Sequence, residues 1–336
     1  MGSDEENRLL SSDKKLRRIF HLIRQRPLPV FLACGLVTFA GTFLAIWIFR
    51  HFQCYTREAG ILWKPASIVD IRRPCPSIDS MYKTAAASNG EKPRICMTTL
   101  TDSKSPSLWQ RLLRCRNFDG VAKLSFPNLQ SYADKHGYSL WDASASIDTS
   151  RPPAWSKILA VQKLLSLTDS VTCDWIFWVD ADIVVMNSTI AVESFLPSSE
   201  STDIDLLITM DRRLTANSGA WLIRNTKWSK EFLETWWNMR RWVREPGLSL
   251  SGDNAAFGHL MEERLKSDAA HIRMVPRCTF NSFAVFVPGQ KISSIPDHNQ
   301  DWYLSENFYH KGDFMAHSSG VDHKEACVSM LLAKST

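Results

Sequence analysis

Hydrophobic and polar residues follow one another along this chain in patterns that predict alternating helices and strands. The most continuous apolar run, 175–179, is short and rich in aromatic and β-branched residues, which predicts a buried strand. Apolar positions at helical spacing predict one helix that Gly137 ends and another at 155–165, just after two prolines. Further strands are expected at 94–100, 138–141, 205–209, 220–223 and 314–317, and further helices at 230–244 and 253–265. This alternation predicts an α/β domain.

The N-terminal part predicts one membrane span. The run 30–49 carries no charged residue, and at about 1.5 Å per residue it reaches the thickness of a bilayer core. Residues 50–54 offer no small-residue cleavage site, so we favour a signal anchor over a cleaved signal peptide or a buried core helix. More basic residues precede the run than follow it, which places 1–29 in the cytosol and the rest of the chain in a lumen or outside the cell. The basic residues compared are Arg8, Lys14, Lys15, Arg17, Arg18, Arg24 and Arg26 before it, and Arg50, Arg57 and Lys64 after it.

Composition and charge narrow the class of protein. The chain has 336 residues and a net charge of +5, but residues 1–50 hold eight Lys or Arg against four Asp or Glu. The remainder therefore carries only +1, which argues against nucleic acid as a partner. Residues 50–92 are rich in Pro, Ser and Ala without an apolar period, so we interpret them as a luminal stem. The segment 93–336 is the expected folded domain.

The cysteines fit a luminal domain without fixing their pairing. The chain contains eight cysteines, one of them (Cys34) within the expected span. The other seven are scattered and show no CxxC metal pattern; they are Cys54, Cys75, Cys96, Cys115, Cys173, Cys278 and Cys327. Asn187 begins an Asn-Ser-Thr sequon, which is a glycosylation site only if the domain is luminal.

Two carboxylates directly follow the apolar strand at 175–179. Asp180 and Asp182 emerge where open α/β sheets bind ligands, and residues two apart in an extended chain project to one side. Their oxygens suit Mn²⁺ or Mg²⁺ and leave coordination positions for a diphosphate. The alternative is a pair of loop-capping aspartates. A second DxD, formed by Asp203 and Asp205, lacks a comparable apolar run before it.

A third protein ligand for such a metal is expected near the C-terminus. His317 follows the strand-like residues 314–316 and is our candidate, although a structural histidine is the commoner role for such a residue. Three other histidines compete for the position: His298, His310 and His323.

The segment 217–229 combines several candidate binding groups. Asn217 offers an amide for hydroxyl groups, and Gly219 precedes an apolar strand where the backbone would approach a ligand closely; a β-turn is the alternative. Arg224 would contact phosphate or pair with an acidic neighbour. Ser229 is expected to cap the next helix, whose tryptophans, Trp236 and Trp237, are expected in the core.

The helix expected at 253–265 begins with a carboxylate and an amide. Asp253 is either the helix N-cap or a carboxylate presented, together with Asn254, beside the reacting group of a substrate.

Taken in order, these segments resemble glycosyltransferase family 34, which holds fungal α-1,2-galactosyltransferases, Golgi α-1,6-mannosyltransferase subunits and plant xyloglucan α-xylosyltransferases. The resemblance covers about residues 93–325, and 217–229 is its most specific part. It is carried by Trp155-Ser156-Lys157, 175–182, 217–229, Asp253-Asn254 and His317-Ser318-Ser319-Gly320. The chain differs from the family in having Asn254 where members commonly carry Gln, and in placing Lys324 four residues after Gly320 instead of two.

The resemblance implies a GT-A type nucleotide-diphospho-sugar transferase fold, an α/β domain whose mixed central sheet is flanked by helices. It implies that Asp180, Asp182 and His317 bind the metal, Mn²⁺ or Mg²⁺, and that the enzyme retains anomeric configuration. It also implies catalytic roles for Asp253 and Asn254. Donor binding is implied for Lys157, Asp180, Asn217, Gly219, Arg224, Gly320 and Lys324.

The function expected from these observations is transfer of a hexose, galactose or mannose, from a nucleotide-diphosphate sugar to a glycan hydroxyl. The expected setting is the Golgi membrane, as a single-pass type II protein with a luminal catalytic domain. Expected partners are the nucleotide sugar, a glycan or glycoprotein acceptor, the membrane and subunits of a glycosyltransferase complex. The alternative is a non-catalytic subunit of such a complex or a luminal glycan-binding protein.

Overall fold

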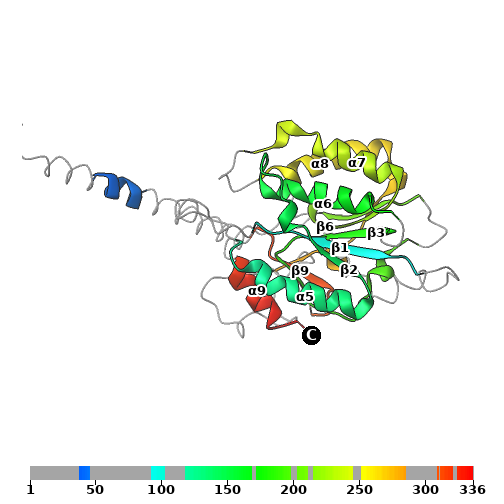
Figure 1. Ribbon diagram of the computed structural model, residues 1–336, viewed down its shortest axis with the longest axis horizontal. Coiled ribbons are helices and arrows are strands. Elements are labelled where there is room, and N and C mark those ends of the chain that lie inside the picture. The colour runs from blue at the N-terminus through cyan, green and yellow to red at the C-terminus, as the bar shows by residue number, and fades with distance from the viewer. Residues whose placement is uncertain are drawn as a thin grey trace, which may run out of the picture. The chain divides into compact units, whose positions relative to one another are not determined.

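The computed structural model describes residues 38–45, 92–102, 118–168, 172–197, 203–210, 215–244, 251–284, 309, 311–320 and 324–335 (Figure 1). The chain divides into two units, Met1–Tyr55 and Thr56–Thr336. In the first unit residues 38–45 are helical. Among the described residues no helix is both long enough and apolar enough to cross a membrane. The rest of the expected span, the tail 1–29 and the stem up to residue 91 lie outside the described residues, so those assignments stay predictions.

The second unit is built on a six-stranded mixed sheet with the order β2-β1-β3-β6-β5-β7. The strands are β1 Ile95–Thr99, β2 Ser139–Asp142, β3 Trp175–Val179, β5 Leu206–Met210, β6 Ala216–Arg224 and β7 Ile272–Met274. β1 runs parallel to β2 and β3, β6 runs antiparallel to β3 and β5, and β7 runs parallel to β5. The mixed α/β architecture expected from the sequence is therefore present.

Helices cover both faces of this sheet (Figure 1). On one face lie α6 Ser156–Leu165, α7 Lys227–Trp237 and α8 Asp253–Ser267; on the other lies α5 Val121–His136, which packs against α9 Lys324–Leu332. A three-stranded sheet, β4 Ile183–Val185, β9 Met315–His317 and β8 Ser282–Phe283, has the order β4-β9-β8. Short 3₁₀ helices occupy Ser144–Ser146, Pro153–Trp155, Val192–Phe195, Arg240–Trp242, Ala269–His271 and Arg277–Thr279.

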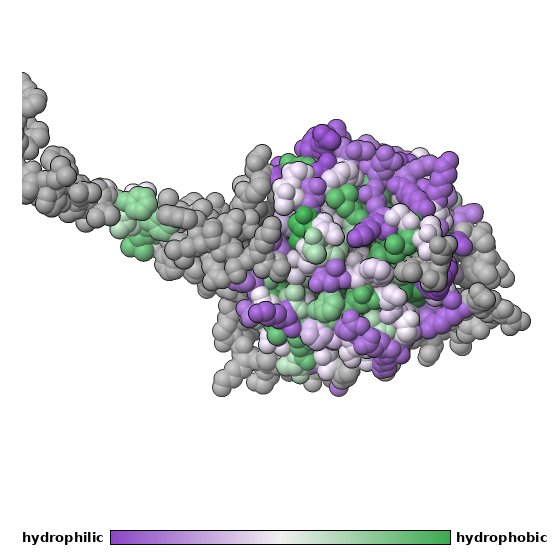
Figure 2. Space-filling model, in the orientation of Figure 1, coloured by the Kyte–Doolittle hydropathy of each residue, from purple (hydrophilic) through white to green (hydrophobic). Residues whose placement is uncertain are grey.

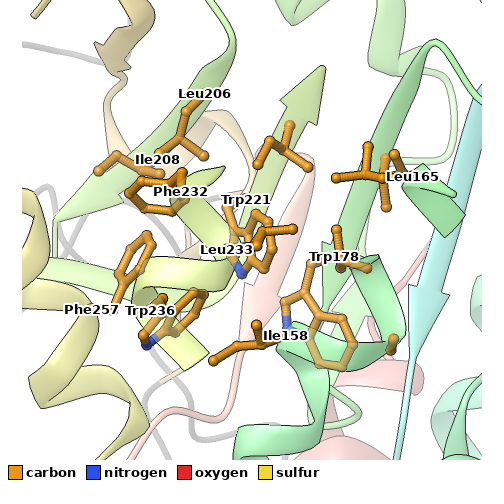
Figure 3. Close-up of a cluster of buried hydrophobic side chains, with 14 of the residues drawn as sticks. Ile158, Leu165, Trp178, Leu206, Ile208, Trp221, Phe232, Leu233, Trp236 and Phe257 are labelled. Carbon is orange, nitrogen blue, oxygen red and sulfur yellow. The ribbon is translucent and has the colours of Figure 1, made fainter. Parts of the chain in front are cut away.

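Alternate residues of β3 enter two separate cores, because successive side chains of a strand point to opposite faces. Ile176 and Trp178 pack with α6, α7 and α8 (Figure 3), while Phe177 and Val179 pack towards α5 and the small sheet. Trp236 is fully buried in the first core, as expected, whereas Trp237 is half-buried. The outer surface over α7 and α8 is hydrophilic (Figure 2), so these helices bury one face only.

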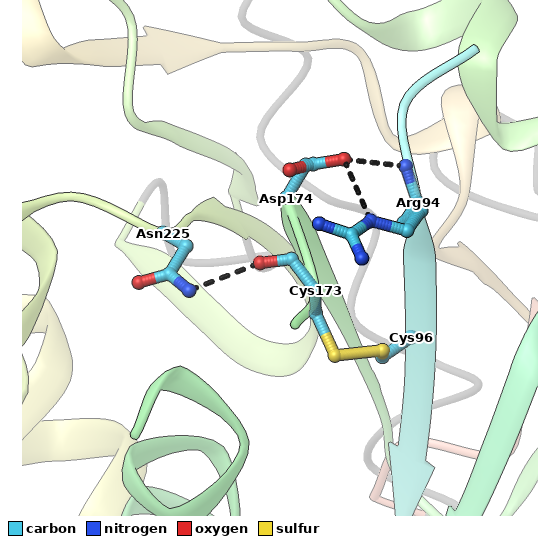
Figure 4. Close-up of a disulfide and its surroundings, with 5 residues drawn as sticks. All are labelled: Arg94, Cys96, Cys173, Asp174 and Asn225. Atoms are coloured by element: carbon cyan, nitrogen blue, oxygen red, sulfur yellow. Dashed lines mark hydrogen bonds and ion pairs between the residues drawn. A yellow bond between two sulfur atoms is a disulfide. The ribbon is translucent and has the colours of Figure 1, made fainter. Parts of the chain in front are cut away.

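A disulfide joins the beginnings of two neighbouring strands. Cys96 of β1 is bonded to Cys173, two residues before β3, and Arg94 pairs with Asp174 beside it (Figure 4). Cys278 is also disulfide-bonded, and Cys327 is a buried free thiol. The sequence left the pairing open, and the parallel register of β1 and β3 is what brings Cys96 and Cys173 together.

Several element boundaries differ from the sequence prediction. Residues 217–219 do not form a turn: β6 begins at Ala216 and includes them, with a register shift against β5 between Ile208 and Thr209. The cap of α7 is Thr226, whose hydroxyl accepts a hydrogen bond from the Ser229 backbone N–H at 3.3 Å, so Ser229 is not the cap. The expected helix 230–244 ends at Trp237.

Candidate active site

Asp180 and Asp182 lie where the large sheet passes into the small one. Asp180 directly follows β3, and its backbone N–H donates to the Gly219 carbonyl at 2.8 Å, so β6 holds the strand end in place. Asp182 directly precedes β4 and is buried, and its carbonyl accepts from the Ser318 N–H at 3.0 Å. Backbone hydrogen bonds to both sheets therefore fix the two carboxylates.

His317 is brought to these carboxylates by the small sheet. It ends β9 and pairs in register with Ile183, the residue after Asp182. Its Nε2 lies 3.4 Å from Asp182 Oδ1, and ligand atoms of Asp180, Asp182 and His317 all lie within 4.8 Å of one another. Neighbouring ligands of an octahedral ion with bonds of 2.0–2.1 Å are about 3 Å apart, so the group fits Mg²⁺ or Mn²⁺ after small adjustments.

Two buried ammonium groups flank the carboxylates. Lys157, in the first turn of α6, lies 3.0 Å from Asp180 Oδ1 and 3.1 Å from Asp253 Oδ2. Lys324, the first residue of α9, contacts Asp182 Oδ2 and the Ser318 carbonyl. Three carboxylates against two ammonium groups leave one net negative charge. A divalent cation would reverse that sign and favour a bound diphosphate.

These contacts set the ionisation of the cluster. Burial raises the pKa of Asp180 above its usual value, with Lys157 opposing that shift. Burial acts in the same direction on Asp182 and Asp253, yet Lys324 holds the pKa of Asp182, and Lys157 that of Asp253, below the usual range. Burial alone would lower the pKa of Lys157, but Asp180 and Asp253 raise it. A cation bound beside Asp180 would stabilise its charged form.

The carboxylate of Asp253 faces the site and does not cap α8. The residue at the N-cap position is Gly252, whose φ of 91° suits glycine, and Asp253 is the first helical residue. Its Oδ1 accepts a hydrogen bond from the Ser251 hydroxyl, and its Oδ2 contacts Lys157 and the Ser218 hydroxyl. The cap interpretation of Asp253 is therefore wrong.

The side chain of Asn254 is hydrogen-bonded to strand β6 beside the carboxylates. Its Oδ1 accepts from the Ser218 backbone N–H at 2.7 Å. Because the oxygen is used in this way, the amide NH₂ is the end of the side chain suited to a ligand.

Gly219 allows a close approach, although to a side chain of the protein itself. A Cβ at this position would lie 2.3 Å from His317 Cε1, so only glycine leaves room for the imidazole ring against β6. The Asn217 side-chain oxygen accepts from the Gly219 N–H at 2.8 Å and from Asn281 Nδ2 at 2.9 Å. Asn217 is buried, and its amide oxygen serves the protein framework.

Sequence reasoning missed two side chains that complete the site. Trp178 points its indole N–H at Asp180 Oδ1 (2.8 Å), and its place in the 175–179 run suggested only core packing. Asn281 hydrogen-bonds His317 Nδ1 at 2.8 Å and is fully buried. Asn281 lies outside every motif singled out in the sequence, and its only signal is a polar residue among aromatic ones.

The structure does not bring every candidate together. Arg224 pairs with Trp175 at the opposite end of β3, about 16 Å along the strand from Asp180. The sequence interpretation grouped Arg224 with Asn217 and Gly219 at one site. These residues lie on one extended strand, β6, whose two ends are far apart. Arg224 is therefore not part of this site.

Two further candidates, Gly320 and Asn187, are described by the structure, and the three competing histidines are not. Gly320 follows His317 by three residues and has a φ of 76°. Asn187 lies in the loop after β4, where its Nδ2 donates to the Gly312 carbonyl at 3.2 Å; its glycosylation stays a prediction. The three competing histidines, His298, His310 and His323, lie outside the described residues.

Comparisons with known proteins agree with this picture. The sequence model of the galactosyl transferase GMA12/MNN10 family matches residues 91–328. The chain is 23% identical over 240 residues to a probable α-1,6-mannosyltransferase, MNN10, of Saccharomyces cerevisiae, covering 62% of this chain and 57% of that protein. It is 27% identical over 136 residues to galactomannan galactosyltransferase 1 of Cyamopsis tetragonoloba, covering 38% of this chain and 30% of that one. The chain thus spans about half or less of the length of these relatives.

Among solved structures, a glycosyltransferase involved in glycosylation of the major capsid of PBCV-1 aligns with a TM-score of 0.47 and 15% identity. That alignment covers 70% of this chain and 99% of the other. The family match spans well over half of the chain and includes Asp180, Asp182, Asp253 and His317. The chain belongs to the galactosyl transferase GMA12/MNN10 family, which is glycosyltransferase family 34.

Proposed function

We propose that this protein is a metal-dependent retaining glycosyltransferase with a GT-A type fold. The observation that carries the proposal is the group formed by Asp180, Asp182 and His317 at the carboxyl end of β3, flanked by Lys157 and Lys324. Two oxygen ligands and one imidazole with open positions suit Mn²⁺ or Mg²⁺. The bound ion would neutralise negative charge on the leaving diphosphate.

The residues around the metal group have separate tasks in this proposal. Lys157 and the Trp178 indole both hold Oδ1 of Asp180, which would leave Oδ2 available to an ion. Lys324 neutralises Asp182 and lies within the same charge cluster, where an incoming phosphate group would offer it a second anionic partner. The His317 ring supplies Nε2.

Retention of configuration in this proposal proceeds by attack on the same face. Both oxygens of Asp253 are engaged by protein donors, and the side chain is 7% exposed, which disfavours bond formation with the anomeric carbon. Its charge still lies beside the cluster and would stabilise an oxocarbenium-like transition state. Asn254 would contribute its NH₂ group to the donor sugar or the leaving group.

The donor we propose is a nucleotide-diphosphate hexose, galactose or mannose, and the acceptor a glycan hydroxyl. The names of the relatives, a mannosyltransferase and a galactosyltransferase, support a hexose donor. The proposed location is the Golgi lumen behind a single N-terminal span. The disulfide between Cys96 and Cys173 supports an oxidising compartment.

The test uses the full chain purified in detergent and offers UDP-galactose, GDP-mannose and UDP-xylose with and without Mn²⁺. We expect release of the nucleoside diphosphate with one donor, its loss in EDTA, and an α-linked product from an α-linked donor. Glycan binding without turnover of any donor would favour a glycan-binding protein or a non-catalytic subunit. Full activity in EDTA would contradict the proposal that Asp180, Asp182 and His317 bind a metal ion that the reaction requires.

A further inference from the structure

The side chain of Asn281 is the centre of a buried chain of hydrogen bonds that joins the two sheets. Asn281 directly precedes β8 and is fully buried. Its Nδ2 donates to Thr209 Oγ1 at 2.8 Å and to Asn217 Oδ1 at 2.9 Å. Its Oδ1 lies 2.8 Å from Nδ1 of His317. The first two partners belong to the large sheet and the third to the small one.

Within this group of hydrogen bonds around Asn281, one backbone group determines which atom donates and which accepts in each bond to Asn217 and His317. The Gly219 N–H can only donate, so the Asn217 atom that it meets at 2.8 Å is the amide oxygen. That oxygen also contacts Asn281, which must therefore turn its NH₂ group towards it. The other end of the Asn281 amide is then an oxygen, which accepts and cannot donate. The His317 Nδ1 that faces it carries a proton.

A neutral imidazole with its proton on Nδ1 has its lone pair on Nε2. This is the nitrogen that lies 3.4 Å from Asp182 Oδ1, a separation longer than a normal hydrogen bond. A lone pair and a carboxylate oxygen facing each other repel unless a positive charge lies near both. Metal-bound histidines commonly donate their other ring N–H to an oxygen acceptor, which fixes the tautomer and the ring orientation.

We propose that Asn281 is a positioning residue that holds His317 in the Nδ1–H tautomer and so selects Nε2 as the metal ligand. The selection originates in the Gly219 N–H and is relayed through Asn217 and Asn281. The role of Nε2 as a ligand rests on the proposed function; the tautomer does not. Asn217, which was expected to bind the donor, serves in this relay through its amide oxygen.

The first experiment reads the tautomer without metal or substrate. The full chain is labelled with ¹⁵N-histidine and studied in EDTA at pH 8.5 by solid-state NMR, with the His317 signal identified by its loss in His317→Gln. We expect Nδ1 protonated and Nε2 unprotonated in the wild type. In Asn281→Ala the proton should move in part or wholly to Nε2, while Asn281→Asp, which keeps an oxygen acceptor, should retain Nδ1–H. An unchanged tautomer in Asn281→Ala, or an Nε2–H wild type, would overturn the proposal.

The second experiment measures Mn²⁺ affinity by titration calorimetry. Removing the partner of a histidine ligand typically weakens metal binding about 10–100-fold, and we expect this for Asn281→Ala, with Asn281→Asp closer to the wild type. The matched control is Asn128→Ala, since the Asn128 amide also hydrogen-bonds through both its oxygen and its nitrogen, to Val185 N and O at 2.8 and 3.1 Å, away from His317. The control should lower Tm and leave Mn²⁺ affinity within about twofold.

The two experiments separate failure of this inference from failure of the proposed function. A wild-type chain that binds no Mn²⁺ contradicts the metal site, while the NMR experiment still decides whether Asn281 sets the tautomer. Equal Mn²⁺ affinity in the wild type and in Asn281→Ala contradicts the positioning role. It does not contradict the metal site. If Asn281→Ala does not fold, Asn281→Asp is decisive: an Nε2–H tautomer in that variant contradicts the claim that an oxygen acceptor at position 281 sets the tautomer.

Discussion

The chain contains two Asp-x-Asp sequences, and each has one carboxylate beside a histidine. Asp182 lies with His317 at the junction of the two sheets, and its histidine uses Nδ1 to bond Asn281. Asp205 lies directly before β5, and its Oδ2 is bonded to His271 Nδ1 at 2.8 Å. In the first pair His317 Nε2 lies 3.4 Å from Asp182 Oδ1, which is longer than a normal hydrogen bond. In the second pair the histidine and the carboxylate are within hydrogen-bonding distance of each other, at 2.8 Å.

The difference between the two sequences comes from what surrounds them. Asp180 and Asp182 follow a strand and are flanked by the buried ammonium groups of Lys157 and Lys324. Asp205 precedes a strand, and its backbone carbonyl accepts from the Arg224 N–H at 2.8 Å. The second sequence thus fastens β5 to β6 and β7. Identical spacing of carboxylates thus occurs in the proposed metal group at one edge of the sheet and in a structural contact elsewhere.

The largest effect that this comparison predicts is on activity at Asp180. Asp180→Asn should reduce turnover by at least about 10³-fold, because the neutral amide lacks the negative charge with which a carboxylate holds a divalent cation. Its fold should persist, since Lys157 keeps Asp253 as a partner. The control is Asp203→Asn, at the same place in the second sequence, which should change turnover less than about twofold. Initial rates and Tm measure both variants, and equal losses would abolish the distinction between the sequences.

Asp253 is expected to show the next largest effect. Asp253→Asn should lower kcat by about 10²–10⁴-fold with little change in donor KM, because charge stabilisation is removed from the transition state. The matched control lies at the other end of α8, where Asp268 bonds Arg264 and Trp228. Asp268→Asn should leave kcat unchanged. Normal turnover in Asp253→Asn would leave this carboxylate with a structural role only.

Gly219 tests whether His317 must lie close to β6. Gly219→Ala should weaken Mn²⁺ binding by about 10–100-fold, because the added Cβ, 2.3 Å from His317 Cε1, displaces the ring. Gly258 in α8 is the control, since a Cβ there meets nothing closer than 3.5 Å. Gly258→Ala should raise stability by about 0.5–1 kcal/mol and keep Mn²⁺ affinity. Calorimetry and thermal unfolding measure these changes, and wild-type affinity in Gly219→Ala would rule out the tight contact.

The smallest effect is expected at the second Asp-x-Asp sequence. His271→Gln removes the partner of Asp205 and should cost about 1–2 kcal/mol of unfolding free energy, with unchanged turnover and Mn²⁺ affinity. Urea unfolding at neutral pH and initial rates are sufficient to measure it. A loss of activity larger than the loss of folded protein would show that the Asp205 pair also serves the reaction.

Much of the fold and part of the site could be predicted from local pattern. Strand 175–179 was expected with the boundaries that β3 has, because its residues are apolar on both faces and both faces are buried. The carboxylates after it were found for the same reason. The Asn217–Gly219 segment was ambiguous, since residues that favour turns also occur in a strand when glycine must admit a neighbouring ring. Arg224 was misassigned because closeness in sequence is not closeness in space along a strand.

The sequence by itself determined the alternation of helices and strands and the position of Asp180 and Asp182 at a strand end, since both depend on short-range hydrophobic pattern. Only the tertiary structure decided which histidine joins them, because β9 pairs with β4 across more than a hundred residues of sequence. It also showed that Asp253 contacts Lys157 and does not cap the helix, and that Asn281 contacts His317. These contacts depend on the packing of two sheets against each other, and no local pattern of residues carries that information.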